Sequence, residues 1–415
     1  MAEHRTDIGA LLDEITAVEL LRGAVARESI TGNEANFVGY LDEQMAARKL
    51  SPVQEEFLPG RPNIFGKRHG SGGGQNLLFI GHTDTVHVDG WRAHWQGDDR
   101  EDPFGGAIVD GEIWGRGTGD LKAGICTSLA ALDLLDKAGI KLKGDVSYAF
   151  IGDEESGEEG TGISAGIHHL TQSQKFLNAH QPDFAVYVEP TQLQVFPAQM
   201  GFFIADITIK GKTAYFGVPE QGIDALKASH QVMQEIWALS DQMGKSARHD
   251  LVGEAFILIT KIEGGGYIAV PGECEMSLIC KVLPGQSLDD AVAALETAIQ
   301  GGIAGTGCQY EISYPAGRDH EFGGSPTDID RSNPAIDQLA QALSRAMPDR
   351  GVINGAPYWS EAPFLIDRLG CPTVYCAPGN IANCHTLEER VSIKEYLAGI
   401  TAFAEFIMRY CGVGE

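Results

Sequence analysis

The sequence has no long hydrophobic run and no secretory signal at its start. None of its apolar stretches approaches the roughly eighteen uncharged residues that a membrane-spanning helix needs. The first residues mix charged and apolar side chains, unlike the basic start and apolar block of a signal peptide. These absences predict a cytoplasmic protein that has no membrane partner.

Positive charge is also scarce. The chain has 31 Lys and Arg residues against 57 Asp and Glu residues, which gives a net charge of −26. Because such a protein repels phosphate backbones, nucleic acid is not expected as a partner. The loop-like stretch GSGGGQ at 70–75 has no Lys-Ser/Thr after it, so it does not predict a phosphate-binding loop either.

The eight cysteines contain no C-x-x-C pair, which argues against a thiolate zinc site. In a cytosolic protein we expect them to be buried and reduced. The role of Cys384 is left open because it adjoins His385.

A chain of 415 residues predicts two domains. Short apolar runs of strand type occur at 76–80, 146–151, 184–188 and 372–377. Helical periodicity marks 8–27, 121–139, 334–347 and 392–411. Strands that alternate with helices predict an α/β domain, with a mostly parallel sheet that is covered by helices on both faces.

The middle of the chain has a different order of elements. Strands are predicted at 202–210, 256–264, 274–283 and 308–314, with helices at 222–239 and 287–300. This βαββαβ order is typical of a ferredoxin-like α+β domain. We therefore expect a catalytic domain made of 1–200 plus 320–415 and an inserted domain at 201–319.

Ionisable residues follow each strand of the predicted parallel sheet. They are His82 and Asp84, then Asp153, Glu154 and Glu155, then Glu189, and finally His385, while Asp120 opens the helix between the first two strands. Because the carboxyl ends of parallel strands share one edge, these side chains should meet there. Separate turn residues and salt-bridge partners would be the alternative, but they do not explain a run of successive strand ends.

Two histidines and several carboxylates make a nitrogen and oxygen ligand set. Such a set suits zinc, with cobalt or manganese as alternatives. Five candidate ligands are enough for two divalent metal ions per chain if one carboxylate bridges them.

Five motifs together resemble a family of dinuclear zinc hydrolases: GHTDTV, GRGTGDLKAG, GDEESGEEG, VEPT, and the histidine after APG. The family includes acetylornithine deacetylase, succinyl-diaminopimelate desuccinylase, aminoacylase and carboxypeptidase G. The resemblance implies that one metal is held by His82, Asp120 and Glu189. The other would be held by Asp120, Glu155 and His385, with Asp120 as the bridge.

The resemblance also implies roles for the neighbours of these ligands. Asp84 would hydrogen-bond the free nitrogen of His82 and fix its tautomer. Glu154 would be the general base, taking a proton from the metal-bridging water and passing it to the leaving amine. The peptide bond from Asp120 to Leu121 would be cis.

Three stretches of the inserted domain and its surroundings depart from the family pattern. Tyr215 stands where a histidine usually helps to stabilise the oxyanion, and a phenol cannot become a cation near neutral pH. Lys281 stands where an arginine binds the substrate carboxylate. In SEAP, at 360–363, Glu361 replaces an aspartate and Pro363 stands where arginine is common. These changes indicate an altered substrate pocket.

The leading hypothesis is hydrolysis of the amide bond of an N-acyl amino acid or a small peptide-like molecule. A second hypothesis is removal of an amino group from a non-peptide substrate, such as an aromatic one. A third is a non-catalytic binding protein on the same fold, which the presence of Glu154 disfavours. A homodimer or higher homo-oligomer is expected through the inserted domain, which has a sheet edge that can pair.

Overall fold

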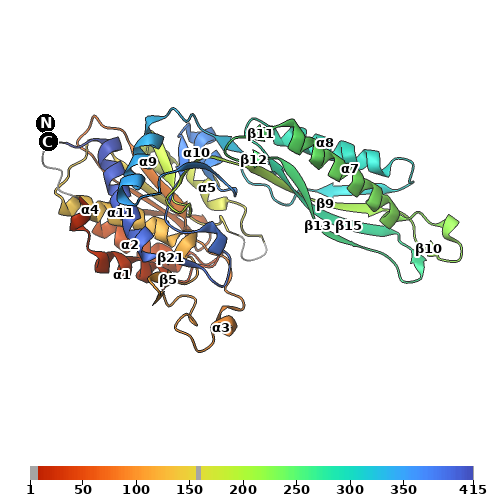
Figure 1. The fold of residues 1–415 in the computed structure, drawn as a ribbon, viewed down its shortest axis with the longest axis horizontal. Helices are drawn as coiled ribbons and strands as arrows, with labels where there is room; N and C mark the ends of the chain where they lie inside the picture. The colour runs from red at the N-terminus through yellow and green to blue at the C-terminus, as the bar shows by residue number, and fades with distance from the viewer. Residues whose placement is uncertain (1–7, 156–159, 415) are drawn as a thin grey trace. The chain divides into compact units, whose positions relative to one another are not determined.

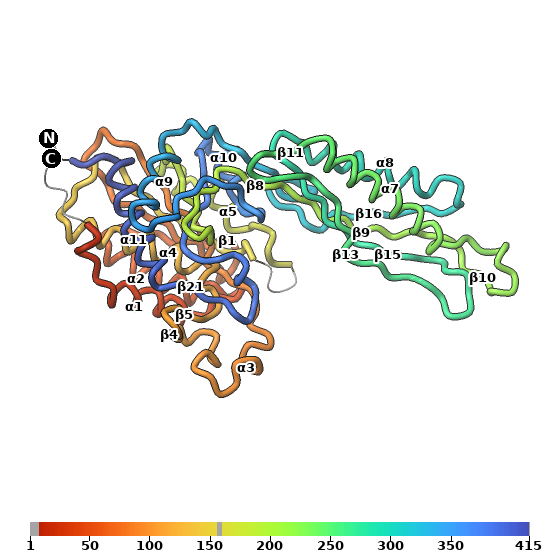
Figure 2. The backbone as a smooth tube through the Cα atoms, viewed as in Figure 1, coloured from red at the N-terminus to blue at the C-terminus, as the bar shows by residue number. Residues whose placement is uncertain are grey.

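The structure is a computed structural model, which describes residues 8–155 and 160–414. The chain forms two compact units. Unit 1 comprises 1–197, 329–354 and 364–415, and unit 2 comprises 198–328 and 355–363. Figure 2 shows that segments from both ends of the chain contribute to unit 1, whereas 198–328 forms most of unit 2. The predicted inserted domain, 201–319, therefore falls within unit 2, which also takes in the later segment 355–363.

The core of unit 1 is a largely parallel sheet, as the sequence predicts. Figure 1 shows helices of this unit in front of that sheet. The central strands of the sheet run in the order β6, β3, β7, β20, and each neighbouring pair is parallel. Their bounds are β3 (Leu77–His82), β6 (Val146–Ile151), β7 (Phe184–Tyr187) and β20 (Thr373–Tyr375). Every residue of these four strands is buried, so both faces of this part of the sheet are covered.

Antiparallel strands extend this sheet on either side. On the β6 side they are β2 (Arg61–Arg68) and β1 (Val53–Leu58). On the β20 side they are β8 (Val195–Gln199) and β18 (Thr327–Asp328). A further strand, β19 (Ile353–Ala356), also pairs with β8. A separate small sheet is formed by β4 (Ala107–Val109), β5 (Glu112–Trp114) and β21 (Arg390–Ser392).

Helices pack against the central strands from several parts of the chain. The long α4 (Ala123–Lys137) and α11 (Ile393–Cys411) both contact β3, and α5 (Ala165–Leu170) contacts β6. The others are η1 (Ile8–Leu11), α1 (Glu14–Val25), α2 (Ala35–Ala47), α3 (Trp91–His94), η2 (Thr118–Lys122), α6 (Gln174–Ala179), α9 (Pro334–Ala346), α10 (Ala362–Leu369) and η4 (Ile381–Asn383). In the described ranges, no helix is both long and apolar enough to cross a membrane.

Unit 2 has the ferredoxin-like arrangement that the sequence predicts. Its sheet runs in the order β13, β15, β9, β16, with every pair antiparallel. The bounds are β9 (Gly201–Lys210), α7 (Ala225–Ser246), β13 (Phe256–Gly264), β15 (Glu273–Val282), α8 (Leu288–Ile303) and β16 (Gln309–Ser313). Alternate residues of β9 and β15 are buried, and α7 and α8 pack side by side over that face.

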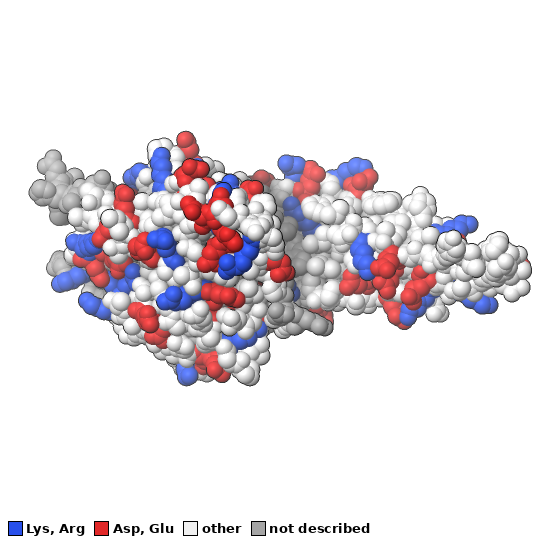
Figure 3. Space-filling view, turned by 90° about the horizontal axis from the view of Figure 1, so that it is seen from below, with Lys and Arg blue, Asp and Glu red and all other residues white. Residues whose placement is uncertain are grey.

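Short elements complete unit 2. They are β10 (Ala214–Tyr215), η3 (Pro219–Gln221), β11 (Arg248–His249), β12 (Gly253–Glu254), β14 (Ala269–Val270) and β17 (Gly323–Gly324). β10 pairs with β14 at one end of the unit. That end shows few charged side chains in Figure 3, whereas acidic and basic side chains are interspersed over the face of unit 1 in the same view.

Candidate metal centre

The predicted ligands lie at the carboxyl edge of the parallel strands. His82 is the last residue of β3, and Glu189 lies two residues beyond the end of β7. Glu155 lies in the segment that follows β6, and His385 lies in the loop that follows β20. Asp120 enters from η2, at the start of the α4 region. The parallel register of the strands brings these positions together from distant parts of the sequence.

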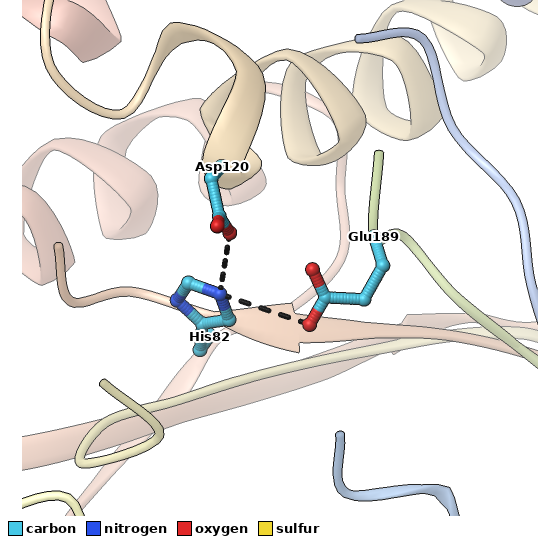
Figure 4. A group of neighbouring side chains, drawn as sticks. All are labelled: His82, Asp120 and Glu189. Atoms are coloured by element: carbon cyan, nitrogen blue, oxygen red, sulfur yellow. Dashed lines mark hydrogen bonds and ion pairs between the residues drawn. The ribbon is translucent and has the colours of Figure 1, made fainter. Parts of the chain in front are cut away.

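The first group of ligand atoms comes from His82, Asp120 and Glu189 (Figure 4). His82 Nε2 lies 3.0 Å from Asp120 Oδ1 and 3.8 Å from Glu189 Oε1. All three side chains are buried. Figure 4 shows the two carboxylates converging on the same ring nitrogen from different elements.

The second group comes from Asp120, Glu155 and His385. His385 Nε2 lies 2.6 Å from Glu155 Oε1 and 3.2 Å from Asp120 Oδ2. Asp120 therefore turns one carboxylate oxygen towards His82 and the other towards His385. In both groups, one ligand atom from each residue lies within 4.8 Å of the others.

The peptide bond between Asp120 and Leu121 is cis, as the resemblance implies. Asp120 itself has extended backbone angles within η2, which interrupts the helical path just before α4. This break lets the Asp120 side chain leave the helix end and reach both histidines.

Asp84 connects the end of β3 to the segment that carries Glu154 and Glu155. Its main-chain carbonyl lies 2.9 Å from His82 Nδ1 and can only accept, so Nδ1 carries the proton and Nε2 faces the ligands. The bond from Asp84 to His82 is the one that the resemblance implies, although the nearer carboxylate oxygen lies 3.8 Å from Nδ1. The Asp84 carboxylate accepts instead from the N–H groups of Glu155 (2.9 Å) and Glu154 (3.3 Å), and from the Thr31 hydroxyl (3.0 Å). The expected orienting role thus belongs to the main chain of Asp84.

The electrostatics of the cluster favour a positive charge at its centre. Burial alone lowers the pKa of His82, but Asp120 and Glu189 outweigh it and raise that pKa well above its ordinary value. Hydrogen bonds to Asp120 and Glu155 raise the pKa of His385 to about 11. Burial would raise the pKa of Asp120, yet its histidine partners hold it below its usual range. The negative field that holds protons on these imidazoles also attracts divalent cations.

The donor set fits two such cations. Every donor in the two groups is an imidazole nitrogen or a carboxylate oxygen, which suits zinc, cobalt or manganese. Three carboxylates crowd into a largely buried space, which is costly unless positive charge compensates them. A third group places Glu154 with His82 and Glu155, so Glu154 also faces the cluster.

Sequence reasoning missed a buried ion cluster that anchors the Glu154–Glu155 segment. Arg61 donates to Asp153 at 2.8 Å and to Glu34 at 2.9 Å, and all three are buried. The Asp153 carboxylate also accepts three main-chain N–H groups, from Gly162, Ile163 and Ala165. Asp153 therefore binds the chain beyond the segment as well as Arg61. No local pattern in the sequence links these residues.

The three predicted substrate contacts all lie in unit 2. Tyr215 is 59% exposed, and its ring contacts that of Phe216 at a centroid distance of 4.6 Å. Lys281 donates from Nζ to the Val252 carbonyl at 2.6 Å, and burial lowers its pKa. Glu361 is fully buried. Their contacts with a substrate stay a prediction.

All eight cysteines are free and buried, as predicted. Cys384 adjoins His385, but its Sγ lies 3.5 Å from the Asn380 carbonyl and it belongs to none of the ligand groups found among the described residues.

Comparison with known proteins agrees with this geometry. Residues 78–409 match the profile of peptidase family M20/M25/M40. An acetylornithine deacetylase of Vibrio cholerae is 25% identical over 412 residues, covering 95% of this chain and 98% of that protein. A tripeptidase of Staphylococcus aureus has a TM-score of 0.77 at 17% identity, covering 97% of this chain and 99% of that one. A dinuclear metal-binding M20 peptidase of Bacillus subtilis has a TM-score of 0.68 at 14% identity, covering 96% and 98%.

The fold and the ligand groups define a dinuclear metal-dependent hydrolase. The chain belongs to peptidase family M20/M25/M40, which confirms the resemblance carried by its motifs.

Proposed function

We propose that this enzyme hydrolyses the C–N amide bond of an N-acyl amino acid or a small peptide-like substrate, with zinc as its metal. The observation that carries the proposal is the Asp120 carboxylate, whose two oxygens face two different histidines in two ligand groups that share it. The similarity to an acetylornithine deacetylase supports an N-acyl substrate. We place the reaction in the cytoplasm.

His82, Asp120 and Glu189 would hold one ion, and Asp120, Glu155 and His385 the other. When bound, the pair would act as a Lewis acid on the scissile carbonyl and lower the pKa of a water. The carbonyl of Asp84 holds His82 with Nε2 facing the ion, and the Asp84 carboxylate fixes the main chain at Glu154 and Glu155.

Glu154 is assigned the proton transfer. Its side chain approaches His82 and Glu155, yet it lies outside the two groups that share Asp120. Because it is only half-buried, it can reach substrate as well as the cluster. Its carboxylate accepts a proton from the attacking water and gives it to the nitrogen of the leaving amine.

A substrate panel tests this assignment. Purified enzyme is incubated with N-acetyl and N-succinyl amino acids, dipeptides and aromatic amines, and released products are identified by mass spectrometry. We expect free amino acid from at least one N-acyl or peptide substrate. Ammonia from an aromatic amine alone would instead make this an aminohydrolase. Binding without turnover across the panel would contradict the proposal.

We also propose that the enzyme is a homodimer that pairs through unit 2. In its strand order β13 stands at one end, so one side of that strand is available to a second chain. The strand exposes Phe256, Leu258 and Ile262, apolar side chains that a partner would cover. Light scattering of the purified protein is expected to give twice the mass of the chain.

Replacement of Tyr215 by Phe is expected to lower turnover about a hundredfold. The proposed reason is that its hydroxyl donates to the developing oxyanion in the partner subunit, and loss of one such donor costs about 2.7–4 kcal/mol. Metal content should not change. Tyr267→Phe is the matched control, because Tyr267 is a fully exposed tyrosine of the same unit. A Tyr215→Phe enzyme with the wild-type rate would remove Tyr215 from the reaction.

A further inference from the structure

We propose that Glu389, together with Arg116, is a positioning residue that sets the affinity of one of the two metal ions. In the part of the chain that the structure describes, its carboxylate hydrogen-bonds Arg116 and two main-chain N–H groups rather than a ligand side chain. Glu389 acts through the main chain of Asp120 and through the loop that carries His385. The inference rests on the proposed function, because it concerns the ion assigned to Asp120, Glu155 and His385.

The Glu389 side chain forms hydrogen bonds with the segment that ends at Asp120. Its Oε1 accepts from the main-chain N–H groups of Gly119 and Asp120, both at 3.0 Å. Its Oε2 accepts from Arg116 Nη1. Both Glu389 and Arg116 are buried, at 1% and 2% exposed. The carboxylate therefore satisfies two buried donors at the one ligand that both metal groups share.

The main chain of Glu389 holds the same segment from its other side. Its carbonyl accepts from the N–H of Gly115 at 3.1 Å. The next residues form β21, which pairs antiparallel with β5, just before Gly115 in the chain. Glu389 lies four residues after His385, so one residue fixes the spacing between the Asp120 segment and the His385 loop.

Arg116 offsets the electrostatic cost of burying the Glu389 carboxylate near Asp120. A carboxylate buried near Asp120 would be repelled by it, and the guanidinium supplies the compensating charge. Arg116 is itself held in place, because Nε donates to the His87 carbonyl at 3.2 Å and the guanidinium lies over the Trp91 ring. Hydrogen-bonded partners of this kind, one step beyond the ligands, typically change metal affinity by about 10–100-fold when they are lost.

The two ions should respond differently. The ion held by Asp120, Glu155 and His385 depends on both segments that Glu389 joins. The ion held by His82, Asp120 and Glu189 depends on only one of them. A purely structural ion pair would lower stability without this asymmetry.

Glu389→Gln tests the inference. The amide oxygen can still accept from the two N–H groups, but the amide NH₂ cannot accept from Arg116. The side chain should therefore shift away from Arg116 while the fold is kept. Metal-free protein is titrated with zinc by calorimetry against a competing chelator, and bound zinc is counted by elemental analysis. We expect one ion to bind about 10–100-fold more weakly and the other to change much less. If Glu389→Gln does not fold, Glu389→Asp, which keeps the charge on a shorter side chain, is expected to show the same asymmetry.

Arg48→Met is the matched control. Arg48 forms an ion pair with Asp133 in unit 1, and its side chain is 8% exposed. Its guanidinium donates to Asp133 and Gln44, neither of which is in a loop or strand end that carries a ligand. Thermal unfolding of the metal-free proteins measures the structural cost of each change. Two results would overturn this inference and leave the proposed function standing. Glu389→Gln could bind both ions with wild-type affinity. It could also bind both ions equally weakly, with a loss that merely follows the loss of thermal stability. A wild-type chain that binds fewer than two ions would overturn the proposed function together with this inference.

Discussion

Complete removal of divalent metal is expected to reduce turnover by about a thousandfold or more. Without the ions nothing in the two ligand groups polarises a carbonyl, and that charge stabilisation is worth several kcal/mol. Each loss of about 1.4 kcal/mol lowers the rate tenfold. Enzyme stripped by a chelator and verified as metal-free by elemental analysis is assayed on the best substrate of the panel. Zinc, cobalt or manganese should restore the rate.

The fold of the stripped enzyme must be checked separately, because the three crowded carboxylates repel one another once the cations leave. Circular dichroism before and after stripping distinguishes loss of the metal from loss of structure. Asp120→Asn is an independent way to obtain metal-depleted enzyme. The shared ligand loses its charge, so both ligand groups should bind metal more weakly. Full activity in a verified metal-free preparation would refute the metal-dependent reaction.

The position of the site was predictable because its ligands obey a topological rule. His82 ends one buried strand and Glu189 follows another, and parallel strands put such residues on one edge whatever their distance in sequence. The ferredoxin-like unit was also predictable from the sequence. Apolar and more polar residues alternate along β9 and β15, and this alternation matches the alternate burial of their side chains.

The supports of the site were not predictable from that pattern. Arg61 with Asp153 and Arg116 with Glu389 are pairs between distant segments. Arg116 and Asp153 lie within quoted motifs, but nothing in those motifs indicates that Glu389 and Arg61 are their partners. Asp84 does hydrogen-bond His82 Nδ1, but the sequence does not indicate that its carbonyl, rather than its carboxylate, makes the bond. The local sequence also does not predict that 355–363 belongs to unit 2, because that assignment depends on tertiary contacts.

The remaining prediction concerns Glu154, the residue that separates a catalytic centre from a metal-binding one. Glu154→Gln keeps the size of the side chain and removes only its ability to carry a proton. General base catalysis is typically worth about 10²–10⁴-fold, so kcat should fall by that factor. Because the lost interaction belongs to the transition state, kcat and kcat/KM should fall together. Both ions should remain bound, since each has three other ligands in the groups that share Asp120.

The metal count decides between two roles for this side chain. Glu154 also forms a group with His82 and Glu155, so it could serve as a ligand instead of a base. If Glu154→Gln loses zinc in proportion to activity, it is a ligand, and if it keeps both the zinc and the wild-type rate, it has neither role. The expected result, full zinc with little turnover, leaves proton transfer as the function removed. Glu19→Gln, on the exposed face of α1, is the matched control and should change neither quantity.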